Sequence, residues 1–205
     1  MTRRLFVLLL ALVFCGTAGA DLYVNIGITS GGSWPHSPYV ITPLSTAPDW
    51  MPDTFDTFCV ERYQTFSPGN YRATIDQDIL YAGGSSPVTL NDDVKKIYAA
   101  YLNGGLGGIA GNVVQTSVWG AQGYSSYSID DDIADIIGID DLTVFNPGDI
   151  SGWNDVQVLN LRGTRGQDRQ SQVVMTPVPG AGLLGAIGLG VASWRLRRRK
   201  VSADR

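Results

Sequence analysis

The chain has few cysteines, few histidines and few basic residues in its central part, and each shortage excludes a class of function. Two cysteines occur among 205 residues, and one of them, Cys15, lies in an apolar N-terminal stretch. The other, Cys59, therefore has no partner for an internal disulfide. The single histidine, His36, has no cysteine or acidic residue nearby. We therefore predict neither a zinc site nor a Cys-His catalytic pair.

Basic residues are scarce between residues 21 and 179, where seven Lys and Arg face eighteen Asp and Glu, a net charge of −11. Proteins that bind nucleic acid need clustered Lys and Arg to neutralise phosphates. The charge balance therefore argues against a nucleic-acid partner. The length of this part is enough for one domain with a hydrophobic core.

Residues 1–20 are typical of a secretory signal peptide. A basic pair, Arg3 and Arg4, precedes an apolar run at 5–14, and Ala18-Gly19-Ala20 follows. This order of charged, apolar and small residues predicts an N-terminal signal helix that is cleaved after residue 20. A single cysteine in an exported chain is then a liability, a dimer contact or a nucleophile.

Residues 177–205 combine a turn, an apolar stretch and a basic end. Pro177-Val178-Pro179 precedes the apolar residues 180–194. The basic end includes Arg197, Arg198 and Arg199. The apolar stretch is shorter than the roughly 20 residues of a comfortable membrane helix, and its basic end should stay in the cytoplasm. We expect a C-terminal hydrophobic helix that anchors the body outside the cytoplasm, with a plain tail anchor or a glycine-rich packing face as alternatives.

This C-terminal arrangement resembles the PEP-CTERM family of Gram-negative exported proteins, whose sorting signal is a Pro-Glu-Pro motif, a hydrophobic helix and an arginine cluster. The resemblance implies an exosortase-type membrane protease as a partner that removes the segment. It also implies a location in the cell envelope, at the surface or outside the cell. Val178 stands where the family has glutamate, so cleavage stays an open question.

The body predicts an α+β fold, mainly an antiparallel β domain with an inserted helical segment at about 91–138. Alternating or β-branched stretches predict strands at 22–26, 55–60, 71–75 and within 142–161. Helices are predicted through 94–101, 113–121 and 133–137, starting near Asn91, Asn112 and Asp130. Residues 21–160 then form the extracytoplasmic domain, and the polar residues 161–176 predict a tether.

Two short motifs give Cys59 a candidate partner. They are Phe58-Cys59-Val60 and Val114-Gln115-Thr116-Ser117-Val118-Trp119. On a helix, residues four apart lie on the same face, so Gln115 and Trp119 share one face and Val114 and Val118 share a neighbouring stripe.

The two motifs together resemble the signatures of the thioester domain, a family best known from Gram-positive surface adhesins. The resemblance implies that Cys59 supplies a sulfur and Gln115 an acyl carbon, and that ammonia leaves as an internal thioester forms. It implies a shielding shell around the bond, made by Phe58, Val60, Val114, Val118 and Trp119. The implied function is covalent attachment to an amine-bearing surface partner or a polysaccharide, without a cofactor and without enzymatic turnover.

Two alternatives stay open. The bond could act mainly as a stabilising cross-link. It would close a loop of 56 residues between Cys59 and Gln115, which is worth roughly 4 kcal/mol in the chain-entropy treatment of disulfides. Without a bond, Cys59 is a small buried hydrophobe and Gln115 an ordinary helix residue. The chain is then a non-covalent structural protein of the cell envelope or of an exopolysaccharide matrix.

Acidic residues near these motifs have plainer predicted roles. Glu61 is expected on the strand face opposite Cys59, so it is not predicted to be a base for the thiol. The aspartates between Asp130 and Asp141 lack the spacing of a calcium loop. We expect them to start a helix and to face solvent.

Overall fold

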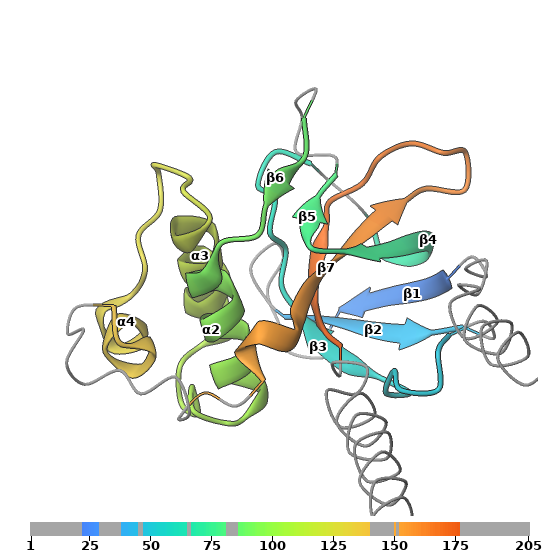
Figure 1. Ribbon diagram of the computed structural model, residues 1–205. Coiled ribbons are helices and arrows are strands. Elements are labelled where there is room, and N and C mark those ends of the chain that lie inside the picture. Colours follow the sequence, from blue (N-terminus) through green and yellow to red (C-terminus); the bar gives the residue numbers. More distant parts are fainter. Residues whose placement is uncertain are drawn as a thin grey trace, which may run out of the picture. The chain divides into compact units, whose positions relative to one another are not determined.

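A computed structural model describes residues 22–28, 38–44, 47–64, 67–80, 86–139, 150 and 152–176 (Figure 1). The signal helix predicted at 1–20 and the hydrophobic helix predicted at 177–205 lie outside these residues. Among the described residues, no helix has the length and apolar character needed to cross a membrane.

Most of the described body is one six-stranded antiparallel sheet, in the order β3-β2-β1-β4-β7-β8. Its strands are β1 (Leu22–Ile28), β2 (Tyr39–Pro43), β3 (Phe55–Thr57), β4 (Gly69–Asp76), β7 (Val156–Arg162) and β8 (Gln172–Met175). A small hairpin of β5 (Asp78–Ile79) and β6 (Val88–Thr89) stands beside it. The prediction of a mainly antiparallel β domain agrees with this arrangement.

The sheet nearly closes into a barrel because the residues after β3 pair with β8. The Val60 N–H donates to the Ser171 carbonyl at 3.0 Å, and the Val173 N–H donates to the Phe58 carbonyl at 3.1 Å. Cys59 lies opposite Gln172 in this antiparallel bridge. The chain that follows β3, the first strand of the order, is therefore hydrogen-bonded to β8, the last strand. Cys59 lies where the sheet closes.

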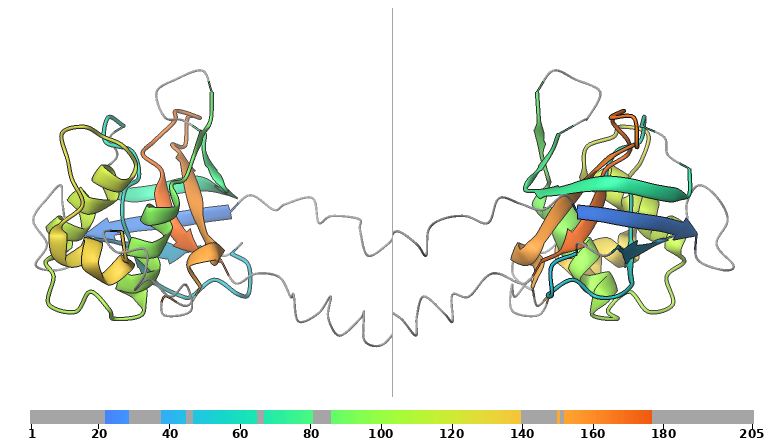
Figure 2. Two further views of the ribbon diagram at one scale, coloured as in Figure 1. Left: turned by 60° about the vertical axis from the view of Figure 1, so that its left-hand side comes forward. Right: turned by 90° about the vertical axis from the view of Figure 1, so that its right-hand side faces the viewer.

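Three helices lie together on one side of the sheet (Figures 1 and 2). They are α2 (Asp92–Leu102), α3 (Gly111–Ala121) and α4 (Asp131–Ile137), and a short 3-10 turn η1 (Trp153–Asp155) precedes β7. The side chains of Asn91 and Asp130 cap α2 and α4, as predicted. The expected cap at Asn112 is wrong: Ala110 is the N-cap of α3 and uses its extended backbone without a side-chain bond.

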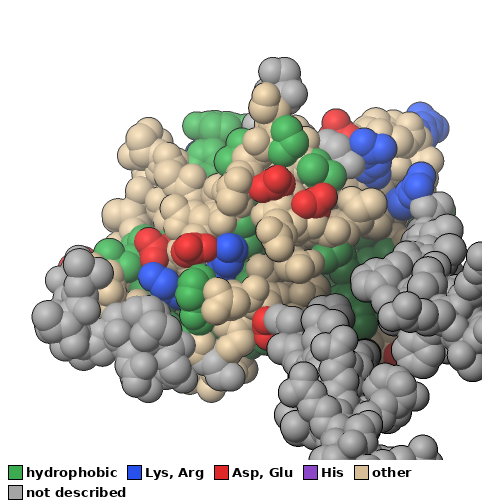
Figure 3. All heavy atoms as spheres, viewed as in Figure 1, with side chains coloured by type: hydrophobic (Ala, Val, Ile, Leu, Met, Phe, Trp, Pro, Cys, Tyr) green, Lys and Arg blue, Asp and Glu red, His purple; other side chains and the backbone are tan. Residues whose placement is uncertain are grey.

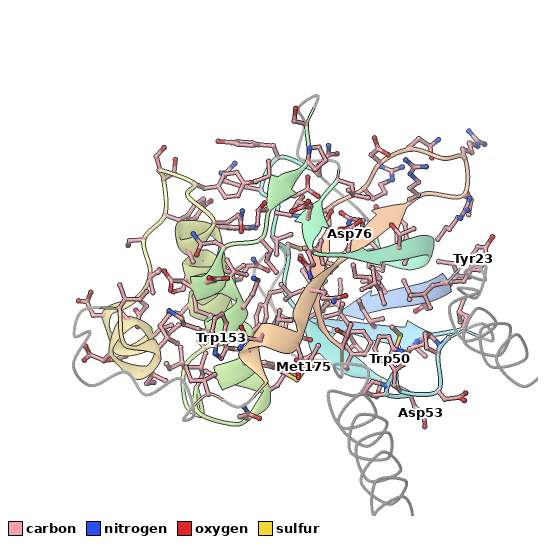
Figure 4. The ribbon with its side chains drawn as sticks, viewed as in Figure 1. Tyr23, Trp50, Asp53, Asp76, Trp153 and Met175 are labelled. Atoms are coloured by element: carbon pink, nitrogen blue, oxygen red, sulfur yellow. The ribbon has the colours of Figure 1, made fainter. Side chains whose placement is uncertain are left out.

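Alternation along the strands divides the buried residues into two clusters. One face contributes Val24, Ile41, Cys59, Leu159 and Val174 to a cluster inside the near-barrel. The opposite face and the helices form the second cluster, which includes Phe58, Val60, Ile97, Tyr98, Val114, Val118, Val158 and Val173. Trp153 and Met175 pack against this second cluster close to α2 (Figure 4). We call the two clusters the barrel core and the helix-side core.

The polar tether predicted at 161–176 is wrong up to Met175. The chain turns back after β7 and returns as β8, which pairs with β7 from Val156↔Met175 to Leu159↔Gln172. Val173 and Val174 are buried on opposite faces, and polar Ser171 and Gln172 are buried with hydrogen bonds. The prediction of a tether relied on the polar composition of this segment. It failed because these polar side chains form hydrogen bonds inside the protein. Of the strand predicted within 142–161, residues 142–149 and 151 lie outside the described part of the chain.

Candidate functional site

The sulfur of Cys59 faces the barrel core beside two polar side chains. Gln172 lies directly opposite Cys59, with its Nε2 at 3.2 Å and its Oε1 at 3.5 Å from Sγ. The hydroxyl of Tyr39 is also hydrogen-bonded to the thiol. Flanking bonds between the strands leave Cys59 and Gln172 as a non-hydrogen-bonded pair, the type in which facing side chains come closest. The three polar groups therefore form a small buried cluster in an otherwise apolar interior.

The backbone of Cys59 is held by the side chain of Gln115. The Cys59 N–H donates to Gln115 Oε1 at 2.9 Å, and Gln115 Nε2 donates to the Cys59 carbonyl at 2.8 Å. The N–H and carbonyl of Cys59 point away from β8. They face the position that β2 would fill if its pairing continued past Tyr39 and Thr57. The Gln115 amide thus replaces a peptide group of a neighbouring strand and satisfies two buried backbone groups.

Two close approaches fix α3 in the position that brings Gln115 to Cys59. A Cβ on Gly111 would lie 2.4 Å from Pro38 Cδ, just before β2 begins. A Cβ on Gly120 would lie 2.6 Å from the carbonyl carbon of Ser128. Both ends of the helix therefore require glycine for contact with the neighbouring chain. Gln115, one turn after Gly111, then reaches Cys59 at the position just before β2 begins.

The predicted shell residues are all buried, but they lie on two sides of the strand. Phe58, Val60, Val114 and Val118 belong to the helix-side core, where the Phe58 ring meets the Tyr101 ring edge-on at 4.8 Å. Trp119 instead belongs to the barrel core, the cluster that contains the Cys59 sulfur. Of the shell, only Trp119 shares the side of the strand on which the thiol lies.

A line of aromatic rings leads from Trp119 to the surface. Tyr127 packs on Trp119 with ring centroids 5.1 Å apart, and its hydroxyl accepts a hydrogen bond from Arg62 Nε at 2.7 Å. The Arg62 guanidinium also lies over the ring of Tyr63, which is 76% exposed and packs against Tyr124. We call Arg62, Tyr63, Tyr124 and Tyr127 the aromatic surface cluster.

Burial makes Cys59 a protonated thiol at neutral pH. The pKa of its thiol is raised to about 12; removal from water is the largest cause, hydrogen bonds from Gln172 and Tyr39 act in the opposite direction, and the negative charge of Glu61 adds to the rise. Burial and the neighbouring sulfur likewise raise the pKa of the Tyr39 hydroxyl. This environment is the opposite of the electropositive, partly exposed setting of reactive thiolates.

Glu61 is buried close to the site, at 1% exposure. Its Oε2 accepts the Ser171 N–H at 2.7 Å, while its Oε1 has no hydrogen-bond partner among the described residues. The prediction that Glu61 lies on the strand face opposite Cys59 was wrong. Residues two apart on an extended strand share a face, so Glu61 and Cys59 lie on the same side. Burial raises the pKa of Glu61, against the lowering effect of its bonds to Ser171.

Replacing Glu61 with Gln is expected to stabilise the protein at neutral pH and to have little effect near pH 4. A carboxyl whose pKa is raised on folding stabilises fully below its ordinary value of about 4.3 and loses that contribution as pH rises through the folded value. Glutamine keeps an oxygen for the Ser171 N–H and has no charge to desolvate. Thermal unfolding of Glu61→Gln and wild type across this pH range measures the difference. Exposed Asp53→Asn (Asp53 is labelled in Figure 4) is the matched control, and a lower midpoint for Glu61→Gln at neutral pH would contradict the assignment.

Three residues of this site were not singled out in the sequence: Tyr39, Gln172 and Ser171. Tyr39 follows a proline-rich stretch that gives no strand signal, and the other two lie in the predicted tether. The run Gln172-Val173-Val174-Met175 carries two adjacent β-branched residues and could have indicated a strand. Among the described residues, no group of three His, Cys, Asp or Glu side chains is placed to hold a metal ion.

The site therefore consists of a buried thiol and a buried primary amide, 56 residues apart in sequence and in direct contact through the cysteine backbone. Among the described residues, Cys59 forms no disulfide. An amide held against a cysteine residue can serve as a structural clamp on its backbone, and it can react by acyl transfer if the sulfur reaches its carbon. Comparison of the chain with protein-family models, with characterised proteins and with solved structures finds no match, so the assignment of a function rests on these residues.

Proposed function

We propose that the chain is an exported surface protein in which Cys59 and Gln115 form an internal thioester for covalent attachment to an amine-bearing partner. The observation that carries the proposal is the pair of hydrogen bonds that holds the Gln115 amide against Cys59. These bonds hold the Gln115 amide beside the residue that carries the thiol, and positioning of the two reacting groups is a large part of what such a reaction needs.

The contacts supply part of the chemistry that thioester formation needs. Attack of the Cys59 sulfur on Gln115 Cδ forms the C–S bond and breaks the bond from Cδ to Nε2. The thiol proton is transferred to Nε2, which leaves as ammonia. The Cys59 N–H already donates to Oε1, so it is placed to stabilise the negative charge that develops on this oxygen.

The raised pKa of Cys59 fits a slow reaction that occurs once per molecule. A protonated thiol is a weak nucleophile, but it carries the proton that the leaving nitrogen requires. Cys59 is 1% exposed and Gln115 is fully buried, and such burial would protect a thioester from hydrolysis. The product would last until a nucleophile reaches it.

Attachment is the second step of the proposed function. An amine of the partner attacks Cδ of residue 115, the C–S bond breaks, and the Cys59 thiol is released as a new amide forms. We place the docking surface of the partner at the aromatic surface cluster, since its rings extend from exposed Tyr63 to Trp119, which shares the barrel core with the Cys59 sulfur. The partner class that this chemistry selects is a surface molecule with an accessible primary amine.

Export and sorting are part of the same proposal and rest on the two ends of the sequence. Residues 1–20 would direct secretion, and residues 177–205 would hold the chain at the membrane until an exosortase-type protease acts at Pro177-Val178-Pro179. Mass spectrometry of the protein from its native envelope distinguishes a retained C-terminus from a cleaved one.

Nucleophile trapping tests the thioester. Methylamine added as the protein is unfolded in denaturant is expected to give an N-methylamide on the Gln115 peptide and one titratable thiol at Cys59. Cys59→Ala should give no adduct. An unmodified Gln115 peptide would contradict the proposal, and an adduct on the Gln172 peptide would move the acyl carbon to the other glutamine beside the sulfur.

One observation favours a second function, a non-covalent structural protein of the cell envelope. The hydrogen-bond partners of the sulfur are Gln172 and Tyr39, whereas Gln115 binds only the backbone of Cys59. In this alternative, Gln115 is a clamp that completes the sheet and Cys59 is a small core residue. A fully unmodified Gln115 in the trapping experiment would favour it.

A further inference from the structure

An open cavity of about 440 Å³ lies between the start of β4 and the connection from β7 to β8. Arg165 and Arg169 line it on one side, together with Thr164 and Gln167, and Asn70 and Tyr71 line it on the other. Basic side chains gather at this edge of the molecule, at the upper right of Figure 3, where Figure 1 shows the loop between β7 and β8. The volume lies within the range of pockets that hold small molecules.

The charge of this cavity is opposite to that of the surrounding protein. Two of the seven basic residues between residues 21 and 179 line it, in a region with eighteen acids. None of its lining residues is acidic. The nearest acid in the loop, Asp168, forms an ion pair with Arg162 at 3.5 Å. The cavity therefore favours an anionic ligand.

Both walls of the cavity are held in place by the fold. On the loop side, the Gly163 N–H donates to the Gln167 carbonyl at 2.8 Å, and the Arg169 N–H donates to the Leu161 carbonyl at 3.0 Å. On the other side, the Tyr71 hydroxyl donates to the Ser67 carbonyl. The site is thus formed before any ligand arrives, which lowers the entropic cost of binding.

Arg169 gives the most specific indication of a missing acceptor. Its Nε is buried and has no hydrogen-bond partner among the described residues. A buried donor of this kind is costly unless an acceptor meets it. Arg165 lines the same cavity, is exposed, and makes no hydrogen bond or ion pair with the described residues. Two guanidinium groups are therefore available to one ligand.

We propose that this cavity binds a sugar acid, a small ligand with a carboxylate beside several hydroxyl groups. The planar carboxylate matches the fork of a guanidinium, which binds it through two parallel hydrogen bonds. The neutral side chains of Asn70, Thr164 and Gln167 offer donors and acceptors suited to hydroxyl groups. The cavity also has more space than a bare inorganic ion would fill.

The test is a titration of the isotopically labelled protein with glucuronate, followed by NMR. Saturable shifts are expected for the Arg169 Nε–H signal and for the backbone signals of 163–169. Glucose, which lacks the carboxylate, and acetate, which lacks the hydroxyl groups, are expected to bind at least about tenfold more weakly, since charge-assisted bonds and the neutral contacts each contribute.

Two variants distinguish binding in the cavity from a general effect of the protein's net charge. Arg165→Gln should weaken glucuronate binding about tenfold, whereas Lys95→Gln, which removes the same charge from α2 where Lys95 pairs with Asp92, should leave it unchanged. Equal weakening by both variants would overturn the proposal, as would an absence of saturable shifts. Equal binding of glucose, acetate or inorganic sulfate would also overturn it.

Discussion

Removing the Gln115 side chain is expected to lower the free energy of unfolding by about 2–6 kcal/mol, as two buried polar groups each cost about 1–3 kcal/mol when unsatisfied. The effect is measured in a Cys59→Ala background, where no thioester can form and the backbone of residue 59 is unchanged. In that background, Gln115→Ala leaves the N–H and the carbonyl of residue 59 without the bonds of 2.9 and 2.8 Å. Denaturant unfolding of the single and double variants gives the difference.

Gln122, the C-cap of α3, provides a matched control. Its Oε1 accepts the Asn91 N–H at 3.1 Å and its Nε2 donates to the Thr89 carbonyl at 3.2 Å, the same two bonds as those of Gln115, but at the surface. Water replaces such bonds when they are lost, so Gln122→Ala should cost about 1 kcal/mol or less. Equal effects of the two substitutions would show that the Gln115 clamp contributes no more than a surface contact.

Loss of the cross-link in Cys59→Ala is expected to lower the free energy of unfolding by about 4 kcal/mol if the chain-entropy relation for disulfides holds for a thioester. About 1–3 kcal/mol of this is regained, because the intact Gln115 Nε2 bonds to the carbonyl of residue 59, a bond that the thioester form lacks. The cross-link joins residues 56 apart, and its loss restores conformational freedom to the unfolded chain. Chemical denaturation of the two proteins at one pH measures this.

A cleavage control separates the cross-link from the packing of the sulfur. Wild-type protein that is unfolded with hydroxylamine and refolded keeps the Cys59 thiol but has no thioester. It should match Cys59→Ala in stability to within about 1 kcal/mol, the usual scale of a small core substitution. Hydroxylamine treatment that leaves the unfolding midpoint of wild type unchanged would mean that no cross-link had been present.

Local sequence signals were sufficient for most elements of this fold. Alternation in 22–26 and 71–75 corresponds to β1 and β4, and the Asn91 and Asp130 caps mark the starts of α2 and α4. The start of α3 could not be read locally, because it depends on the contact of Gly111 with Pro38. The strand β8 was missed because its flanking polar residues find their partners only after the sheet has closed.

The candidate site was predictable to the level of its two central residues. The motifs name Cys59 and Gln115, and the fold places them in contact. The mode of contact was not predictable, since the Gln115 side chain takes the place beside Cys59 that β2, which begins only at Tyr39, does not fill, a tertiary feature. Gln172 is brought to the sulfur by strand pairing across 113 residues, and no local pattern encodes such a partner.

The intact mass of the purified protein tests the central claim most directly. The sequence mass is calculated between the termini determined for the purified, processed chain. If Cys59 and Gln115 form a thioester, the wild type is lighter than this mass by one ammonia, and both Cys59→Ala and Gln115→Ala have their full sequence mass. A full sequence mass for the wild type, with one thiol that titrates after denaturation, would contradict the thioester and leave Gln115 as a structural clamp on Cys59.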